Sequence, residues 1–285
     1  MFSTIISPTE LNAHLLHTDW VIVDCRFSLA DKDQGRREYE TAHIPGAHYA
    51  HLDTALSGEI IAGRTGRHPL PSVEKAEQIF SGWGIGPATQ VVAYDHGHGG
   101  VAARLWWLLN WLGHSAVAVL DGGWTAWQAA DFPQDHAVPE PTDGPEFVAR
   151  PDNARVATLD DVVAMSEQKS AALFDSRAAA RYRGDEEPID PVPGHIPAAI
   201  SAPFPDNLAD GRFLPPDQLA ARFRMLLGDL SAEDAVFYCG SGVTACHNLL
   251  ALQHAGLGVA RLYPGSWSEW ITDPARPVAR SAGDR

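Results

Sequence analysis

The sequence is poor in cysteine and contains no long apolar run. Its 285 residues include only Cys25, Cys239 and Cys246, which cannot all pair and are too few for a disulfide framework. No stretch of about 18 consecutive apolar residues occurs, and the first residues lack a basic leader followed by an apolar core. We therefore expect a cytoplasmic protein without a membrane segment, whose thiols stay reduced.

Positive charge is also scarce. The chain has 21 Lys and Arg against 36 Asp and Glu, a formal net charge of −15. Such a chain repels a polyanion such as nucleic acid at long range. It does not exclude a small anion, because salt screens the global field beyond about 8 Å and a local positive pocket dominates inside that distance. We expect a small anionic ligand and no nucleic-acid partner.

What the sequence does contain is a tandem repeat. The segments "VIVDCR" and "AHIPGA" near the start return in the same order as "ALFDSR" and "GHIPAA". Further along, "VVAYDHGHGG" and "DGGWTAW" return as "AVFYCGSGVT" and "PGSWSEW". A proline-rich stretch separates the copies and is typical of a linker. The repeat predicts one domain at residues 1–135, a linker at 136–150 and a second domain at 151–285.

Each copy alternates short apolar runs with helical patterns. Runs such as "WVIVD" and "QVVAYD" in the first copy, and "AALFD" and "AVFYC" in the second, show no polar alternation. Uninterrupted runs of this length favour parallel strands buried on both faces. Several of the helical patterns begin at Ser, Thr or Pro and end at Gly. The prediction is two α/β domains, each a small parallel sheet flanked by helices.

The loop that begins at Cys239 is the main candidate site. It follows a predicted strand and opens a predicted helix, so the sulfur should lie at the carboxyl end of a sheet, where ligands gather. Gly240 and Gly242 allow several amides to point inward and form a concavity that stabilises a thiolate or an attached sulfur anion. A lone cysteine after a strand more often packs as a small hydrophobe, which we expect of Cys25 and Cys246.

These motifs resemble the two-domain rhodanese superfamily, and most closely its 3-mercaptopyruvate sulfurtransferases. The similarity rests on the D-x-R and H-I-P pairs, the "CGSGVTAC" loop and the closing "PGSWSEW", and it covers essentially the whole chain. It implies two rhodanese-like domains, a persulfide on the catalytic cysteine of the second, and no metal or organic cofactor. Asp95 stands where the second copy has Cys239. The resemblance therefore implies a non-catalytic first domain.

The resemblance also implies which residues handle the donor. It implies that Arg177 binds the substrate. Arg181 or Arg183 lies close enough in the sequence to assist, of which we expect Arg181, and Asp175 should orient Arg177. The resemblance further implies a relay of Asp53, His68 and Ser241 that protonates the departing enolate. The remaining predicted contacts come from the loop itself: Gly240, Gly242, Val243 and Thr244.

The loop sequence also bears on the donor. Since it holds no charged side chain, a monoanion such as 3-mercaptopyruvate is favoured over doubly charged thiosulfate. The acceptor is expected to be a thiol, for which a thioredoxin-like protein is one candidate, or cyanide.

Several alternatives stay open. The nearest is a thiosulfate:cyanide sulfurtransferase on the same fold. A cysteine phosphatase would need an arginine where Ala245 stands, and a redox sensor would need Cys246 exposed near Cys239. Asp95, His96 and His98 could suggest a metal site but lack a fourth ligand, so we expect none there. His43 and His195 recur in both copies, and we expect them to fix turns.

Overall fold

The computed structural model describes residues 1–140, 144–170 and 172–281. Two predicted features fall partly outside these ranges: linker residues 141–143, and Ala171 at the start of the apolar run before Asp175. Contacts divide the chain into two compact units. The first holds Met1–Gly58, Leu70–Asp152 and Asp210–Phe213, and the second holds Glu59–Pro69, Asn153–Ala209 and the residues from Leu214 onward. A short segment around His68 thus packs with the second unit.

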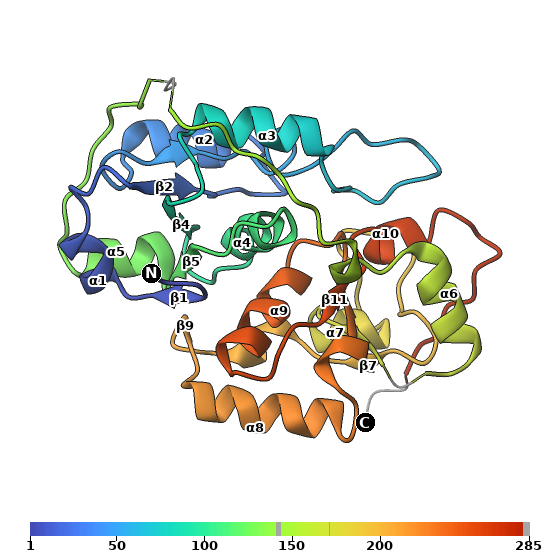
Figure 1. Ribbon diagram of the computed structural model, residues 1–285. Coiled ribbons are helices and arrows are strands. Elements are labelled where there is room, and N and C mark those ends of the chain that lie inside the picture. The colour runs from blue at the N-terminus through green and yellow to red at the C-terminus, as the bar shows by residue number, and fades with distance from the viewer. Residues whose placement is uncertain (141–143, 171, 282–285) are drawn as a thin grey trace. The chain divides into compact units, whose positions relative to one another are not determined.

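The first unit is built on a parallel sheet with strand order β1-β5-β4-β2-β3 (Figure 1). Its strands are β1 (Ile5–Ile6), β2 (Trp20–Asp24), β3 (His48–Tyr49), β4 (Gln90–Tyr94) and β5 (Val117–Leu120). β4 and β5 are buried along their whole length. Burial on both faces explains why these strands are uninterrupted apolar runs, and it confirms the predicted parallel sheet.

Helices cover both faces of this sheet. They are α1 (Pro8–Ala13), α2 (Gln34–Thr41), α3 (Val73–Gly82), α4 (Ala102–Trp111) and α5 (Gly123–Ala129). Val92 and Tyr94 of β4 pack with Trp124 and Trp127 of α5 in one core. In Figure 1, α4 lies across the sheet from α5, and every residue of α4 is buried. The predominance of apolar residues in α4, which has Arg104 and Asn110 as its polar members, follows from this position.

The second unit repeats the design with a parallel sheet in the order β11-β10-β6-β7. Its strands are β6 (Leu173–Asp175), β7 (Ile200–Ser201), β10 (Val236–Tyr238) and β11 (Arg261–Leu262). The short strands outside the two sheets are β8 (Leu208–Ala209) and β9 (Arg212–Phe213). Phe237 stacks on Phe174 at 5.0 Å, while its neighbours Val236 and Tyr238 belong to the opposite core with Trp267. This alternation is that of a strand buried on both faces.

The helices of the second unit again lie on both sides of the sheet. The α-helices are α6 (Leu159–Glu167), α7 (Ala179–Arg183), α8 (Pro216–Leu227), α9 (Ala245–His254) and α10 (Ser266–Trp270). Three short 3₁₀ helices are η1 (Asn153–Arg155), η2 (Phe204–Asn207) and η3 (Ala232–Asp234). Helices α6 and α10 contribute Val162, Trp267 and Trp270 to one core. On the other face, Phe223 of α8 meets Phe237 edge-on at 6.3 Å. The predicted fold class is therefore confirmed.

Local cap chemistry explains where several helices begin. Ser7 and Thr158 each form a capping box with the acidic residue three positions on, Glu10 and Asp161. Ser72 accepts a hydrogen bond from Lys75 N at the start of α3. These polar residues satisfy amides that would otherwise lack acceptors at the helix N-termini, which is why the sequence could locate the helices.

The described part of the predicted linker is ordered against the first unit. Phe147 N donates to Ser81 Oγ at 2.9 Å, and the Phe147 ring meets Phe80 at 5.2 Å. Arg150 N donates to Leu112 O at 2.8 Å. Because Phe147 is buried, this segment contributes to the core of the first unit rather than only spanning a gap.

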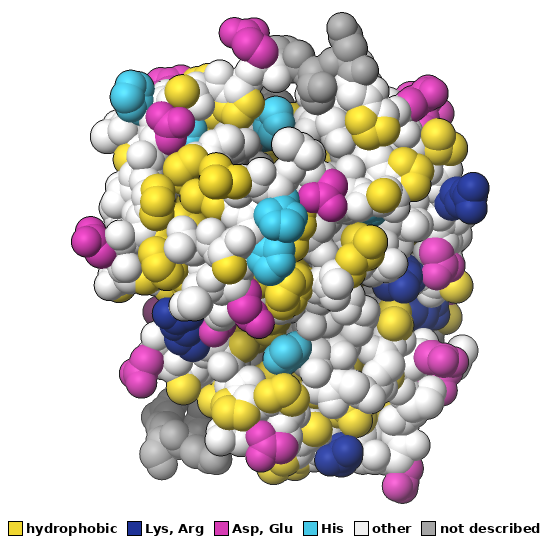
Figure 2. Space-filling view, turned by 60° about the vertical axis from the view of Figure 1, so that its left-hand side comes forward, with side chains coloured by type: hydrophobic (Ala, Val, Ile, Leu, Met, Phe, Trp, Pro, Cys, Tyr) yellow, Lys and Arg dark blue, Asp and Glu magenta, His cyan; other side chains and the backbone are white. Residues whose placement is uncertain are grey.

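Charge is dispersed on the one face of the molecule that the space-filling view shows (Figure 2). On the face seen in Figure 2, acidic side chains are scattered among neutral and apolar ones, and basic side chains stand singly or in small groups. This distribution matches the excess of acidic residues in the sequence. Among the described residues, no helix combines the length and apolar character needed to cross a bilayer.

Candidate active site

Cys239 directly follows β10, at the carboxyl end of the second sheet, and the loop continues to α9. Its amide donates to Ser266 Oγ at 3.1 Å, and its carbonyl accepts from Trp267 N at 3.0 Å. Gly242 has φ +74°, and a Cβ there would lie 2.3 Å from Pro264 O. Only glycine fits this position, because both the backbone angle and the neighbouring carbonyl exclude a side chain.

The first unit contains a corresponding loop with a carboxylate in place of the thiol, in which residues 96–101 lead from Asp95 to α4 whereas residues 240–244 lead from Cys239 to α9. Asp95 follows β4, and its carbonyl accepts from Trp124 N at 2.8 Å, as that of Cys239 does from α10. One carboxylate oxygen accepts from Gly97 N at 3.0 Å and Gly99 N at 2.9 Å. The other accepts from Val101 N at 2.9 Å and, more weakly, from Ala102 N at 3.3 Å. All four of these hydrogen bonds to the anion therefore come from backbone amides of the loop.

The surrounding groups stabilise the negative charge of the Asp95 carboxylate. Burial by itself would raise the pKa of the carboxyl group, but His98 and the amides of Gly99, Val101 and Gly97 outweigh burial and lower it. The carboxylate thus stays ionised although only 1% of the residue is exposed. His98 and the loop amides together therefore stabilise a buried negative charge.

The Cys239 loop resembles this arrangement. Each loop contains a glycine with φ +74°, Gly99 four positions after Asp95 and Gly242 three positions after Cys239. Among the described residues, no acceptor lies within hydrogen-bonding range of the amides of Ser241, Val243 and Thr244. The carboxylate oxygens of an aspartate lie two bonds from Cβ, as does the outer sulfur of a cysteine persulfide. Asp95 is thus a geometric analogue of a persulfide at Cys239.

The two other cysteines are structural, as predicted. Cys246 is fully buried inside α9, and its Sγ donates to Gly242 O at 3.4 Å. Cys25 is fully buried beside β4, and burial, with Asp24 and Asp95, raises its pKa. Cys239 is itself 2% exposed, so a donor has access only to a small part of its surface. A redox sensor would need both thiols exposed, and here Cys239 and Cys246 are both buried.

The structure joins two members of the predicted relay. His68 Nδ1 lies 2.7 Å from Ser241 Oγ, and both side chains are buried. Asp53 lies in the first unit, where its carboxylate accepts from Lys32 Nζ at 2.7 Å. The link from Asp53 to His68 stays a prediction.

Arg177 does not have the surroundings of a substrate ligand. Its Nε and Nη2 donate to Asp175, and Nη2 also donates to Gly194 O at 2.6 Å. Its Nη1 donates to Glu187 at 3.3 Å, and its guanidinium lies over the Trp267 ring. Burial alone would lower the pKa of Arg177, but Asp175 outweighs it and raises the pKa. These contacts correct the prediction that Arg177 binds the substrate.

The first unit supports this correction. Arg26 makes the same bonds to Asp24 and to Ala42 O, and it lies over the Trp124 ring at 4.7 Å. The first unit has no cysteine at the corresponding loop position. A buried ion pair that recurs without the thiol serves the fold of each unit, and Asp175 does orient Arg177 as predicted.

Arg181 lies closer to the loop than Arg177 and is joined there by a residue that the sequence analysis missed. A Cβ at Gly240 would lie 3.1 Å from Arg67 Nη2 and 3.6 Å from Arg181 Nη2. Both guanidinium groups donate to Asp190. Arg67 directly precedes His68 in "RHPLP", but no sequence pattern indicates where its side chain points.

The prediction that His43 and His195 fix turns is confirmed. His43 Nδ1 and His195 Nδ1 bond to the carbonyls of Tyr39 and Tyr182, and each ring stacks on that tyrosine. His96 pairs with Glu38 at 2.6 Å while Asp95 is held by amides. Within the described ranges, no cluster of three or more His, Cys, Asp or Glu could hold a metal ion.

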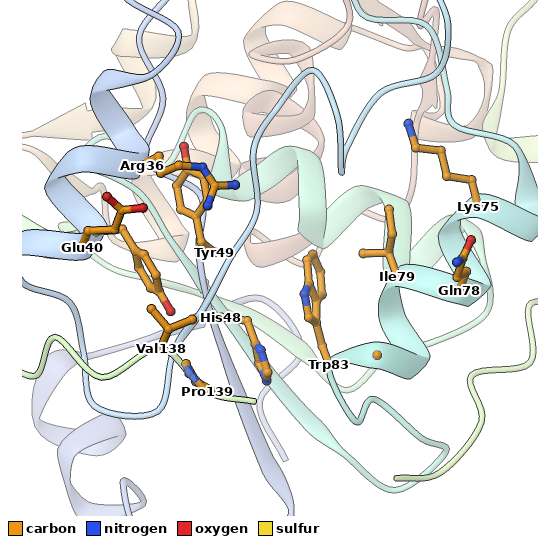
Figure 3. Close-up of a pocket in the computed structure, with 12 residues that line it drawn as sticks. Arg36, Glu40, His48, Tyr49, Lys75, Gln78, Ile79, Trp83, Val138 and Pro139 are labelled. Atoms are coloured by element: carbon orange, nitrogen blue, oxygen red, sulfur yellow. The ribbon is translucent and has the colours of Figure 1, made fainter. Parts of the chain in front are cut away.

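A cavity of about 530 Å³ lies elsewhere, in the first unit (Figure 3). Its walls include Tyr49, Trp83 and His48, with Arg36 over the Tyr49 ring at 5.0 Å. Lys75 at its edge donates to Ser57 O at 2.8 Å. The described lining contains no cysteine that could carry a transferable sulfur, so the chemistry of the side chains favours Cys239 as the active site despite the size of this cavity.

The fold and this loop define a class of protein. The sequence profile of the rhodanese-like domain matches residues 7–130 and 158–273, so the chain belongs to that family.

Among particular relatives, a probable 3-mercaptopyruvate sulfurtransferase of Pseudomonas aeruginosa is 49% identical, over 96% of this chain and 97% of the relative. A putative thiosulfate sulfurtransferase of Mycobacterium tuberculosis is 39% identical over 97% and 96%. The solved 3-mercaptopyruvate sulfurtransferase of Leishmania major superposes with a TM-score of 0.82 at 31% identity, over 95% of this chain and 76% of that one.

Proposed function

We propose that the protein transfers sulfur from 3-mercaptopyruvate to a thiol or cyanide acceptor through a persulfide on Cys239, with release of pyruvate. The chain is a sulfurtransferase, in keeping with its family and with relatives that match nearly its whole length. The observation that supports the persulfide most directly is Asp95. Its carboxylate accepts hydrogen bonds from four backbone amides in the loop that corresponds to that of Cys239.

The cycle has two half-reactions. The Cys239 thiolate attacks the sulfur of the donor, an S–S bond forms and the donor C–S bond breaks. The bonding electrons leave with the carbon as the pyruvate enolate, which takes a proton to become pyruvate. The acceptor then attacks the outer sulfur of the persulfide, which restores the Cys239 thiolate and yields thiocyanate from cyanide or a persulfide from a thiol. Amides of Gly240, Gly242, Val243 and Thr244 stabilise the outer sulfur.

Ser241 and His68 serve the first half-reaction. Their 2.7 Å contact forms a hydroxyl–imidazole pair next to the reactive loop. Such a pair can deliver the proton that the enolate needs as the C–S bond breaks, and Asp53 is the proposed third member that orients His68. If the pair has this role, Ser241→Ala slows pyruvate release but leaves the discharge of a preformed persulfide to cyanide unchanged.

The charges around the loop favour a monoanionic donor. Arg67, Arg177 and Arg181 are balanced by Asp175, Glu187 and Asp190, all joined by ion pairs. A neutral cluster offers no excess positive charge for a dianion such as thiosulfate. The relative named as a putative thiosulfate sulfurtransferase keeps thiosulfate as the alternative donor.

Mass spectrometry tests this function directly. Incubation with 3-mercaptopyruvate should release pyruvate and add the mass of one sulfur atom at Cys239. Cys239→Ser should abolish both, whereas Cys246→Ser should retain both, since Cys246 is a buried helix residue. Turnover in the serine variant, or turnover without any mass change at Cys239, would contradict the proposed cycle.

The setting of the reaction is also proposed. All three cysteines are free thiols, which supports a reducing compartment such as the cytoplasm. A thioredoxin-like protein is one candidate for the thiol acceptor, and it would discharge a Cys239 persulfide in a coupled assay. Persistence of the added sulfur after incubation with reduced thioredoxin would exclude that acceptor.

A further inference from the structure

Arg67 is placed beside the reactive loop by contacts on both sides of it. Its own amide donates to Ser268 Oγ at 2.9 Å, just after the strand-to-helix turn that supports Cys239. Gly66 packs so closely that a Cβ would lie 2.3 Å from Gly265 O. His68 is tied to Ser241. The backbone around Arg67 is therefore fixed, and its side chain extends to Gly240, the residue next to Cys239.

Asp190 sets the spacing between Arg67 and Arg181. Its Oδ1 accepts from Arg67 Nη1, and its Oδ2 accepts from Arg181 Nη2 at 3.1 Å. The Asp190 side chain is 2% exposed, against 26% for Arg67 and 14% for Arg181. A buried carboxylate that bridges two guanidinium groups offsets their mutual repulsion, so two cations can stand side by side at the loop.

The two guanidinium groups retain donors that no protein group uses. Arg67 Nε is buried without a hydrogen-bond partner. Within the described part of the chain, Arg67 Nη2 and Arg181 Nη1 also have no acceptor, whereas Arg181 Nε is held by Glu187. A guanidinium has five N–H donors in a planar fork, and donors left unpaired in a largely buried place cost free energy. Arg177, by contrast, has all three nitrogens engaged.

We propose that Arg67 is a donor-binding residue that, together with Arg181, holds the carboxylate of the sulfur donor, while Asp190 is the positioning residue that keeps the pair in register. This inference rests on the proposed function and names the residues that bind the carboxylate of the α-keto acid donor. The pair lies over Gly240, so a bound carboxylate is held within a few bonds of the sulfur that Cys239 attacks. One carboxylate matches one unused donor from each arginine.

Steady-state kinetics with 3-mercaptopyruvate and cyanide tests the role of Arg67. Arg67→Gln should raise KM for 3-mercaptopyruvate at least 10-fold, with a smaller change in kcat, and should weaken inhibition by pyruvate, which keeps the carboxylate but lacks the sulfur. Discharge of a persulfide preloaded at Cys239 should change less than 2-fold. Arg64→Gln is the matched control, because Arg64 lies in the same segment and is exposed, and its KM should stay within 2-fold of wild type.

A second pair of variants guards against a merely structural effect. Arg67→Lys keeps the charge and a partner for Asp190 but loses the fork, so KM should still rise, to a value between those of wild type and Arg67→Gln. Asp190→Asn should raise KM and leave preloaded discharge intact. If KM is unchanged in both Arg67 variants and the enzyme still releases pyruvate, the proposed role of Arg67 is wrong while the proposed function stands. Failure of the wild-type protein to release pyruvate would instead overturn the proposed function.

Discussion

Asp95 and Cys239 occupy corresponding places in two copies of one fold and differ in what their side chains can do. Both follow a central strand, and the carbonyl of each accepts from the second residue of a later helix, Trp124 of α5 for Asp95 and Trp267 of α10 for Cys239. The carboxylate of Asp95 uses the loop amides permanently and cannot transfer sulfur. At Cys239 the proposed role of the loop amides is to stabilise a charge that comes and goes, and this is what a two-step transfer requires.

The stabilisation of the Asp95 carboxylate by its loop should make the free energy of unfolding depend on pH. Asp95→Asn should lower the free energy of unfolding by about 1–3 kcal/mol at pH 7, because charge-assisted hydrogen bonds are lost. The folded-state pKa of Asp95 lies below its ordinary value, so the stabilisation is complete above about pH 4 and is lost as the pH falls through the folded pKa.

Urea unfolding at pH 7 and pH 3.5 should therefore show the gap between wild type and Asp95→Asn narrowing in acid. The control is Asp19→Asn, since the Asp19 side chain is 69% exposed and should change stability little at either pH. A gap that is constant or widens in acid would contradict this stabilisation of the Asp95 carboxylate.

At the scale of elements, the strand-loop-helix from β10 to α9 is what turns a cysteine into a reactive group. The first turn of α10 holds the loop through three hydrogen bonds. Ser266 Oγ accepts from Cys239 N, Trp267 N donates to Cys239 O, and Ser268 N donates to Gly240 O. Ser266 has φ +56°, a strained angle for a non-glycine residue that here allows its hydroxyl to cap Cys239 N. The geometry of the loop thus depends on the element behind it.

Replacing Gly242 should damage this element selectively. In Gly242→Ala the new Cβ would lie 2.3 Å from Pro264 O, so the loop must shift and kcat/KM should fall about 100-fold. Gly256→Ala is the matched control. Gly256 has a similar φ of +72° at the end of α9 but nothing within 4 Å of a Cβ, so this variant should lose about 1 kcal/mol of stability and keep its activity. Equal activities would contradict the required loop geometry.

At the scale of the whole molecule, the net charge of −15 acts on every anionic donor that approaches. The repulsion at long range is twice as large for a dianion as for a monoanion, and salt screens it. The ion pairs around the loop leave no compensating positive excess. The electrostatic background therefore favours the singly charged donor.

This background predicts how donor preference varies with salt. The ratio of kcat/KM for 3-mercaptopyruvate to that for thiosulfate should exceed 1 at 20 mM ionic strength and should decrease as ionic strength rises to 200 mM. Taking the ratio removes most of the competition by added anions, because both donors meet it. A preference for thiosulfate, or a ratio that grows with salt, would contradict the charge argument.

The sequence by itself determined the duplication, the parallel strands, the helix caps and the loop with Cys239. These features are local, because apolar runs, cap residues and glycines act within a few positions of the chain. It also indicated the pairing of His68 with Ser241 through resemblance, which the 2.7 Å contact supports.

Only the tertiary structure decided which arginines face the loop. Arg67 forms an ion pair with Asp190, 123 positions away in the chain. Arg177, which the sequence favoured as the substrate ligand, donates its hydrogen bonds to Asp175, Glu187 and the carbonyl of Gly194. The physical reason is that an arginine is long and flexible, so its partner is set by the burial and charge of groups that come together only in the folded chain.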